Sequence, residues 1–413
     1  LSYWLVFLDD NKCGSFKYTV SSTSLNAYRS KHLTSFIVLH RKPDVLDLER
    51  SAYYGGRTEC FYVGTLDDDT YYYLDVNNMY GYVMRTNEYP RELRNVSTNV
   101  SLPLLKHWLK NYCVIADVDV TINEPVYPIR VDKYTCYPVG SFRTVLSTPE
   151  LLYAIDRGWI KTVYVAAVYR KAHLFRSFVD YYRSKRVEYD QQQNKVMSRI
   201  CKMMINSLYG KFGQRQITQQ IVGHCEPHIV KRESVIDAKT FETYELIYIG
   251  GTIFREIKAG ETRFSCPSIA AHVTAYARMY LWNYIRKVVH GQVYYCDTDS
   301  LIIDSSGLVD LLDYIDDHEI GKLKVECVGN HLSIQSRKSY VLGDRVRLKG
   351  ISRSAQHIGN NRYIQDYWLR LKGLVQFGDL DNYTVRHIEK SLSNQIHGGI
   401  LTPSGWIQPF VFG

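Results

Sequence analysis

The sequence predicts an α+β fold, because short β-rich runs bounded by turn signals stand apart from long helical stretches. Two hairpin signals support the sheet: Gly250-Gly251 joins the runs 244–249 and 252–257, and Asp297-Thr298-Asp299 joins the runs 293–296 and 301–303. The helical prediction rests on residues 174–212, which contain no Pro and no Gly before Gly210. No internal repeat or low-complexity segment is present.

The other elements are predicted in chain order. Residues 26–62 are polar and should form an irregular approach to the core, whereas Tyr71–Val76 should be a short strand. A helix should span Thr148–Arg157, with Ser147 or Thr148 as its N-cap. Residues 174–212 should form one long helix or two paired helices, and Ser268–Val289 another helix. The segment after Gly350 should be a small separate subdomain.

The composition is that of a globular chain. Its 413 residues allow two or three domains, and hydrophobic residues make up 45% of it. No apolar run approaches the roughly 18 to 20 residues of a membrane span, so we expect no membrane association. Leu1 stands where Met is usual. We therefore expect the natural N-terminus to be missing, and a targeting segment could have been lost with it.

The net charge of +9 is clustered, which favours a polyanionic partner. Residues 176–215 carry nine Lys or Arg against three acidic residues, and a second cluster comprises Arg337, Lys338, Arg345, Arg347, Lys349 and Arg353. Two solvated basic faces would give the same pattern. The nine cysteines form no CxxC pair, which indicates reduced thiols and an intracellular protein. Cys225 with His224 and His228 lacks the second ligand pair of a zinc site.

Acidic residues at strand ends suggest a metal site. Asp297 and Asp299 flank one residue at a hairpin tip, so both carboxylates can face one side and share a divalent cation. A lone D-x-D motif also caps turns and occurs in metal-dependent glycosyltransferases. Asp75 ends its strand, where an Asp is commonly a turn former. If the two strands meet, these carboxylates would hold two Mg²⁺ ions about 4 Å apart, the arrangement used for in-line phosphoryl displacement.

One helix face carries a set of polar groups suited to a nucleotide. Lys202, Asn206 and Tyr209 lie on the same face of the predicted helix. Lys202 would neutralise triphosphate oxygens, while Tyr209 and Gly210 offer a flat face and a gap to a base pair. An ordinary amphipathic helix with a polar side is the alternative, and its Met and Leu positions are predicted to be core.

In this order the motifs resemble those of family B DNA polymerases. The three signature motifs are matched by Asp75-Val76-Asn77-Asn78-Met79-Tyr80, by Lys202-x-x-x-Asn206-Ser207-x-Tyr209-Gly210 and by Tyr295-Cys296-Asp297-Thr298-Asp299-Ser300. Three more elements resemble the protein-primed branch found in phages, linear plasmids and related viruses. They are Tyr53-Tyr54-Gly55-Gly56-Arg57 (YxGG), Thr274-Ala275-Tyr276-Ala277-Arg278 (TxxAR) and Lys338-Ser339-Tyr340 (KxY). Six ordered motifs over residues 20–350 make the resemblance specific.

The resemblance implies a right-hand polymerase with an antiparallel palm sheet, helical fingers and a small thumb. It divides the chain into a remnant after a missing exonuclease domain (1–70), a first palm part with an insertion (71–165), fingers (166–213), a β-hairpin insertion (214–265), a second palm part (266–350) and a thumb (351–413). The implied reaction transfers a nucleotide from dNTP to a primer hydroxyl on a DNA template. Two Mg²⁺ ions, or Mn²⁺ in their place, would be the cofactors. We expect an intracellular monomer whose compartment the sequence does not indicate; it would be the host cytoplasm or mitochondrion for a viral or plasmid-borne gene.

The resemblance also implies residue roles. Asp75 and Asp299 would bind both metals, with support from Asp297 and the Val76 carbonyl, which would also lie at the nucleotide. Lys202 and Arg186 would hold the triphosphate, and Tyr80 would stack under the incoming sugar and exclude a 2′-hydroxyl. Asn206 and Tyr209 would contact the nascent base pair. DNA contacts would come from Tyr53, Gly55, Gly56, Thr274, Arg278, Lys338 and Tyr340.

The interval between Asp75 and Lys202 holds 126 residues, more than a palm strand pair and the start of the fingers require. In the protein-primed branch an insertion here receives a terminal protein, and Tyr82–Arg130, predicted to be polar and irregular, is the candidate docking surface. The alternative is an enzyme that extends ordinary annealed primers. Gly81 and Asn78 depart from the family's usual Pro and Ser, and residues 216–261 are long for its processivity insertion.

Three other interpretations of the sequence are less consistent with its motifs. Asp47-Leu48-Glu49 has the D-x-E form of a proofreading site, but it lies almost against the YxGG element, so we expect any exonuclease upstream of Leu1. A glycosyltransferase using Asp297 and Asp299 leaves the Lys202–Gly210 motif unexplained. An inactive polymerase serving as a nucleic-acid-binding scaffold would not need the three carboxylates and Lys202 that are present.

Overall fold

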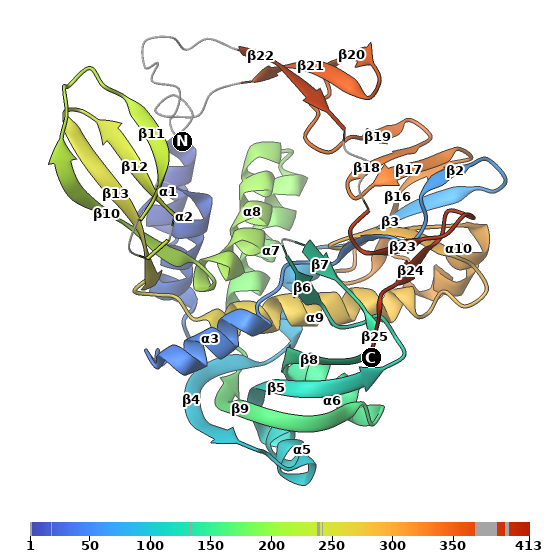
Figure 1. The fold of residues 1–413 in the computed structure, drawn as a ribbon, viewed down its shortest axis with the longest axis horizontal. Coiled ribbons are helices and arrows are strands. Elements are labelled where there is room, and N and C mark those ends of the chain that lie inside the picture. Colours follow the sequence, from blue (N-terminus) through green and yellow to red (C-terminus); the bar gives the residue numbers. More distant parts are fainter. Residues whose placement is uncertain are drawn as a thin grey trace. The chain divides into compact units, whose positions relative to one another are not determined.

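The computed structural model describes residues 2–17, 19–132, 134–237, 240–241, 243–367, 386–392 and 396–413 of the chain. It combines helices with mainly antiparallel sheets (Figure 1). The chain forms two compact units. Unit 1 comprises Leu1–Gly213, Phe264–Arg347 and Gln395–Gly413, and unit 2 comprises Gln214–Arg263 and Leu348–Asn394. Among the described residues, no helix has the length and apolar character needed to cross a membrane.

A five-stranded antiparallel sheet of unit 1 carries the acidic motifs. Its strand order is β1-β14-β15-β3-β16, and the strands are β1 (Thr58–Cys60), β14 (Val293–Asp297), β15 (Ser300–Ile303), β3 (Tyr71–Val76) and β16 (Leu323–Gly329). The bounds of β3 are those predicted, and β14 and β15 form the predicted hairpin. A buried layer rich in tyrosine, including Tyr71, Tyr73, Tyr294, Tyr295 and Tyr340, supports the sheet. The acidic turn therefore stands on a rigid base.

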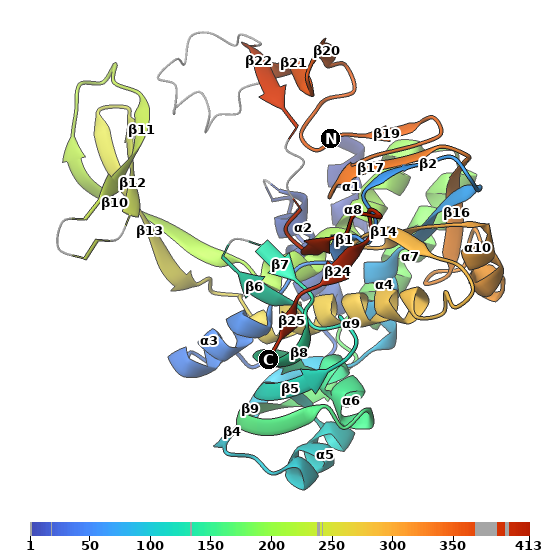
Figure 2. The same ribbon diagram turned by 45° about the vertical axis from the view of Figure 1, so that its right-hand side comes forward.

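Four helices share one hydrophobic core with this sheet: α4 (Met79–Thr86), α7 (Arg176–Gln191), α8 (Lys195–Phe212) and α9 (Pro267–Ile285). The long stretch 174–212 is thus a helix pair. The chain reverses where Gln193 has φ 57°, and the Asn194 side chain caps α8 by accepting the amide of Met197. Figure 2 shows α9 running beneath α4 and α7 in unit 1.

A second sheet follows α4 and corrects one prediction. Its order is β25-β8-β5-β9-β4, with β25 (Val411–Phe412), β8 (Val139–Ser147), β5 (Cys113–Ile122), β9 (Ile160–Ala172) and β4 (Tyr89–Thr98), and it is accompanied by α5 (Leu102–Asn111) and α6 (Thr148–Asp156). The predicted helix at Thr148 is confirmed, with Ser147 and Glu150 forming its capping box. The prediction that Tyr82–Arg130 is irregular is wrong, because the apolar residues of β5 and α5 are buried in a core that they share with α6, β9 and α9.

The prediction of an irregular segment over 26–62 is also wrong. The N-terminal part contains α1 (Ser2–Asp10), α2 (Val20–Ala27), the π-helical turn η1 (Tyr28–His32) and α3 (Pro43–Ala52). Pro43 at the first position starts α3, and Val45, Glu49 and Ala52 form its buried face. This buried face shows helical spacing even inside a polar segment.

The remaining strands of unit 1 form smaller sheets. One has the order β19-β18-β17-β2, with β19 (Arg345–Arg347), β18 (Ser339–Leu342), β17 (Leu332–Ser336) and β2 (Gly64–Leu66). The pairs β6 (Ile129–Val131) with β7 (Tyr134–Cys136) and β23 (Gly399–Leu401) with β24 (Ile407–Pro409), the helix α10 (Ser305–Leu311) and the 3₁₀ turn η2 (Leu312–Tyr314) complete it.

The C-terminal segment 351–413 is not one subdomain. Its last part belongs to unit 1, where β25 pairs in parallel with β8 and Trp406 packs against Tyr62 and Tyr294. The described strands of the first part lie in unit 2: β20 (Gln356–Gly359), β21 (Arg362–Tyr367) and β22 (Arg386–Ser391). The contacts of Trp406 with Tyr62 and Tyr294, which lie far from it in the sequence, therefore attach the last part of the chain to unit 1.

Unit 2 also contains the predicted glycine hairpin. Its sheet has the order β10-β13-β12-β11, with β10 (Arg215–His224), β13 (Thr252–Glu261), β12 (Thr243–Ile249) and β11 (Lys231–Ile236). Gly250 and Gly251 have φ of 58° and 77°, the left-handed pair that a two-residue hairpin turn requires.

Candidate active site

The register of the five-stranded sheet gathers the predicted carboxylate residues at one end. Asp75 of β3 lies opposite Ser300 of β15, and Asp297 of β14 lies opposite the same Ser300. The amide of Val76 donates a 2.7 Å hydrogen bond to the carbonyl of Asp299. Two motifs more than 200 residues apart in the sequence are thus joined through the main chain.

The acidic turn is held by the segment that precedes β1. Thr298 has φ 65°, which is rare for a β-branched residue, and its amide donates to the carbonyl of Arg57 at 2.6 Å. A Cβ atom on Gly56 would lie 2.8 Å from Cγ2 of Thr298. Gly56 therefore lets the main chain approach the turn closely.

Asp75 and Asp299 are half-buried, and their carboxylate charges repel each other. Burial, then the charges of Asp299 and Glu326, raise the pKa of Asp75 to about 7, although Lys202 and Arg345 oppose the shift. Burial, then the charge of Asp297, raise the pKa of Asp299 to about 6. Such a pair favours a proton or a divalent cation, and hard cations prefer carboxylate oxygens.

Asp297 is engaged differently. Its Oδ1 accepts hydrogen bonds from Thr58 Oγ1 at 2.9 Å and Thr298 Oγ1 at 3.1 Å, and Nζ of Lys338 lies 3.2 Å away. Across the described ranges, no three His, Cys, Asp or Glu side chains converge as a metal cage. In this structure Asp297 is held by hydrogen bonds and an ion pair, and its supporting role at a metal stays a prediction.

A cavity of about 350 Å³ adjoins Asp75. Its walls come from the start of α4, from α7 and α8, from the loop before β16 and from β16 itself, and its charged lining residues are Asp75, Arg183, Arg186, Asp190, Lys202, Asp317, Lys324 and Glu326. Lys202 and Arg186, predicted to hold a triphosphate, are thus both beside Asp75. The cavity suits a polyanion accompanied by a cation.

Glu326 was missed from the sequence. The ladder between β16 and β3 shifts register between Val325 and Cys327, so Glu326 is the extra residue of a bulge, and its side chain lines the cavity. Its carboxylate bonds Nη1 of Arg345 at 2.9 Å, and its charge raises the pKa of Asp75. Only Val325 separates it from Lys324, but no sequence pattern predicts the bulge.

The predicted aromatic residues meet each other. The rings of Tyr80 and Tyr209 stack with centroids 4.6 Å apart and planes 4° apart, so these faces are covered in this structure. Asn206 lies on the exposed side of α8 and lines a second hollow of about 470 Å³, which it shares with Lys202. Lys202, Asn206 and Tyr209 therefore share a face, as predicted, but only Lys202 reaches the carboxylate cavity.

The two departures at the start of α4 are coupled. Asn78 has φ 49°, and a Cβ on Gly81 would lie 2.3 Å from its Nδ2 atom. The side chain of Asn78 thus occupies the space that a larger residue at 81 would need. Asn78 is a lining residue of the carboxylate cavity, so this pair shapes the cavity wall.

The prediction that Thr274 and Arg278 contact DNA is corrected by their burial. Both lie within α9 and are at most 2% exposed. Arg278 forms a 2.7 Å ion pair with Glu150 and donates to the carbonyls of Tyr54 and Gly55. A guanidinium can bond several carbonyls at fixed angles, so Arg278 holds the YxGG segment in place from inside the protein.

The other predicted DNA contacts divide between surface and core. Gly55 and Lys338 are exposed, and Lys338 has φ 64°. Tyr340 is 4% exposed and packs against Tyr73 and Tyr295. Tyr53 is half-buried, and its ring lies where a Cβ on Gly213 would be. Gly55 and Lys338 thus lie at the surface, although the Lys338 ammonium pairs with Asp297, whereas Tyr340 supports the sheet.

Two weaker motifs have structural explanations. Glu49 of Asp47-Leu48-Glu49 is 1% exposed and accepts hydrogen bonds from Tyr169 and from the amide of Ser268 at the start of α9. It therefore caps a helix, as an acidic group there should. Cys225, His224 and His228 belong to no metal-binding cluster among the described residues.

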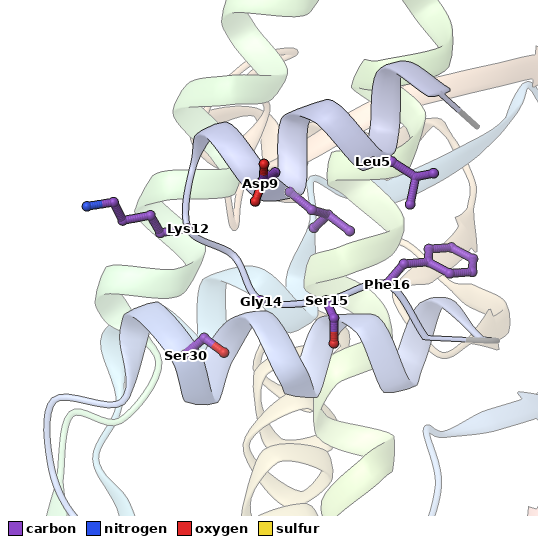
Figure 3. Close-up of a pocket in the computed structure, with 8 residues that line it drawn as sticks. Leu5, Asp9, Lys12, Gly14, Ser15, Phe16 and Ser30 are labelled. Carbon is purple, nitrogen blue, oxygen red and sulfur yellow. The ribbon is translucent and has the colours of Figure 1, made fainter.

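A larger cavity lies between α1, the following loop and η1. Its volume is about 540 Å³, and Figure 3 shows the side chains that line it: Leu5, Leu8, Asp9, Lys12, Ser15, Phe16 and Ser30, beside Gly14. Asp9 and Lys12 are its only charged groups. This cavity therefore has fewer charged lining residues than the carboxylate cavity.

Comparisons with known proteins agree with this geometry. The sequence model of a family described as DNA polymerase type B, organellar and viral, matches residues 12–290. A protein of Neurospora intermedia named probable DNA polymerase is 22% identical over 78% of this chain and 33% of its own length. The DNA-directed DNA polymerase of Enterobacteria phage PRD1 is 25% identical over 83% of this chain and 59% of its own length. The chain thus spans less than two thirds of either relative.

The fold is similar to that of solved polymerases. A structure of phi29 DNA polymerase complexed with primer-template DNA and incoming nucleotide substrates superposes with a TM-score of 0.65 at 15% identity. The match covers 94% of this chain and 70% of that one. The predicted α+β, right-hand polymerase fold is thereby confirmed.

Proposed function

Because the chain belongs to the organellar and viral family of type B DNA polymerases, we propose that it is the polymerising part of a DNA-directed DNA polymerase. The observation that carries this proposal is the pairing of Asp75 and Asp299 beside a cavity lined by Arg183, Arg186, Lys202 and Lys324. A polyanionic nucleotide and a divalent cation together match that set of charges. The second basic cluster around Lys338 and Arg345 adds positive charge for DNA phosphates.

The residues of the site have different roles. Asp75 and Asp299 fit a divalent cation, because partial burial, and after it the negative charge of neighbouring carboxylates, raises their pKa values. Family B polymerases use divalent ions, and two Mg²⁺ ions, or Mn²⁺, held here would supply charge neutralisation at the reacting phosphate and at the leaving pyrophosphate. Lys202 neutralises the triphosphate from α8. Asp297, bound by Thr58 and Lys338, keeps the acidic turn in one conformation.

The subdomains follow from this function. We assign the five-stranded sheet to the palm and the helix pair α7 and α8 to the fingers. Residues 214–265 form the hairpin insertion, and the described strands that follow Gly350 in unit 2 belong to the thumb. Tyr80 is the second residue of α4, five residues after Asp75, and it would meet the sugar once its ring leaves Tyr209.

Incorporation of labelled dNTP on a primed DNA template tests the polymerase function. The wild-type chain should extend the primer only when Mg²⁺ or Mn²⁺ is present, and Asp299→Asn should not. Asp317→Asn is the matched control, because it removes an exposed carboxylate from the same cavity. A wild-type chain that binds primer–template without extending it would favour the scaffold alternative, and transfer of a sugar from a nucleotide sugar would favour a glycosyltransferase.

We further propose that the complete protein starts synthesis on a terminal protein. The YxGG, TxxAR and KxY elements support this, as does the sheet inserted between α4 and α7. A Ser, Thr or Tyr hydroxyl of the partner would replace the primer hydroxyl, since the reaction needs only an oxygen held in line with the α-phosphorus. Within Tyr82–Arg130, the outer strand β4 and the exposed Leu104 of α5 offer a docking surface.

Priming is tested with the full-length enzyme, labelled dNTP and the product of the neighbouring replication gene, without any nucleic-acid primer. Label bound covalently to that protein, resistant to nuclease and absent with Asp299→Asn, would support protein priming. If nucleotide incorporation depends strictly on an annealed primer with every candidate partner, protein priming is refuted and the enzyme extends ordinary primers.

A further inference from the structure

The cavity beside Asp75 carries positive charge on two walls. Arg183, Arg186 and Lys202 line it from the helices α7 and α8, whereas Lys324 lines it from β16. Arg186 is engaged by Asp190 at 3.7 Å. In the part of the chain that the structure describes, the side chains of Arg183, Lys202 and Lys324 take part in no ion pair or hydrogen bond. Three cations are thus available to a ligand.

Lys324 enters the cavity from the same face of the sheet as Asp75. The two residues lie directly opposite each other in the antiparallel ladder of β16 and β3. Side chains in this relation project to one face with Cβ atoms about 5 Å apart. Lys324 nevertheless forms no ion pair with Asp75. Its ammonium can therefore bind an anionic ligand.

The family motifs account for Lys202 and Arg186 but for neither Arg183 nor Lys324. A ligand held only by the helix pair would leave the ammonium of Lys324 on β16 without a negatively charged partner. The outer phosphates of a nucleoside triphosphate, and the pyrophosphate released from it, carry several negative charges on a compact group. Such a group gains most when cations approach from two sides, because each adds a charge-assisted hydrogen bond.

We propose that Lys324 of β16, with Arg183 of α7, binds the two outer phosphates of the incoming nucleotide and then the leaving pyrophosphate. The inference rests on the proposed polymerase function and extends its nucleotide site to the strand wall. The pyrophosphate is thereby held between helix and sheet. A phosphate of primer or template DNA is the competing ligand for the same ammonium.

Steady-state primer extension with Lys324→Gln tests the proposal. The KM for dNTP should rise about 10-fold, as expected for the loss of one charged hydrogen bond, and the inhibition constant of added pyrophosphate should rise by a similar factor. Lys324→Arg should restore most of both values. Lys322→Gln is the matched control, because it removes the same charge two residues away and does not line the cavity.

The outcomes separate the alternatives. Unchanged KM and pyrophosphate inhibition in Lys324→Gln would overturn the proposal. If Lys324→Gln weakens primer–template binding in the absence of nucleotide by as much as it raises the KM for dNTP, the proposal is also overturned. Lys324 would then be a DNA-binding residue. If Lys324→Gln melts at a lower temperature than Lys322→Gln, failure of Lys324→Arg to restore KM would count against the proposal. A wild-type chain that incorporates no nucleotide would instead refute the polymerase function itself.

Discussion

Replacement of Asp75 by asparagine should abolish nucleotide transfer and at the same time stabilise the metal-free protein above neutral pH. Asparagine matches the size of aspartic acid but cannot ionise. Burial and the charges of Asp299 and Glu326 raise the pKa of Asp75 from 3.8 to about 7. Because the folded state binds the proton more tightly than the unfolded state, the free energy of unfolding falls as pH rises from about 4 to 7.

The size of the effect follows from the shift. About three pKa units at about 1.4 kcal/mol each give roughly 4 kcal/mol at pH 8. Asp75 borders an open cavity, where solvent screens part of the repulsion, so about 2 kcal/mol is expected. Relative to the wild type, Asp75→Asn should gain this stability at pH 8 and less than half of it at pH 5. At pH 5 the Asp75 carboxyl of the folded wild type is protonated in most molecules and so carries no charge.

Urea unfolding in the presence of EDTA measures the difference, with wild type, Asp75→Asn and the control Asp317→Asn compared at pH 5 and pH 8. Added Mg²⁺ should stabilise the wild type at pH 8 but not Asp75→Asn. Primer extension by the same preparations reports activity. A lower stability of Asp75→Asn at pH 8, or an equal gain in Asp317→Asn, would refute the reasoning about buried repulsion.

The remaining predictions concern selectivity, positioning, pH and folding. Tyr80→Val should reduce the preference for dNTP over rNTP by about 10-fold or more, measured as a ratio of kcat/KM values; an unchanged ratio would leave Tyr80 as a core residue. Thr58→Val should lower kcat about 10-fold by freeing Asp297, whereas Thr58→Ser should not. The affinity for Mg²⁺ should fall about 10-fold from pH 8 to pH 6, as the carboxylate pair takes up a proton. Arg278→Met should destabilise the protein by about 3 kcal/mol or more, because Glu150 would be buried unpaired.

Local patterns were sufficient for the parts of the site that lie within a few residues of each other. The strand Tyr71–Val76, the hairpin around Asp297 to Asp299 and the common face of Lys202, Asn206 and Tyr209 all follow from side-chain periodicity and turn chemistry. The same periodicity is present in α3, which starts at Pro43 inside a segment predicted to be irregular.

The sequence by itself determined which chemical groups the site contains, because the residue types and their local spacing are written in each motif. Only the tertiary structure decided how they are used. Burial turned Arg278 into an internal clamp, the bulge in β16 brought Glu326 to Asp75, and the register set Lys324 opposite the same carboxylate. These outcomes depend on pairing and packing between segments far apart in the chain. No local pattern encodes such contacts, since a shift of one residue in register would turn each side chain to the other face.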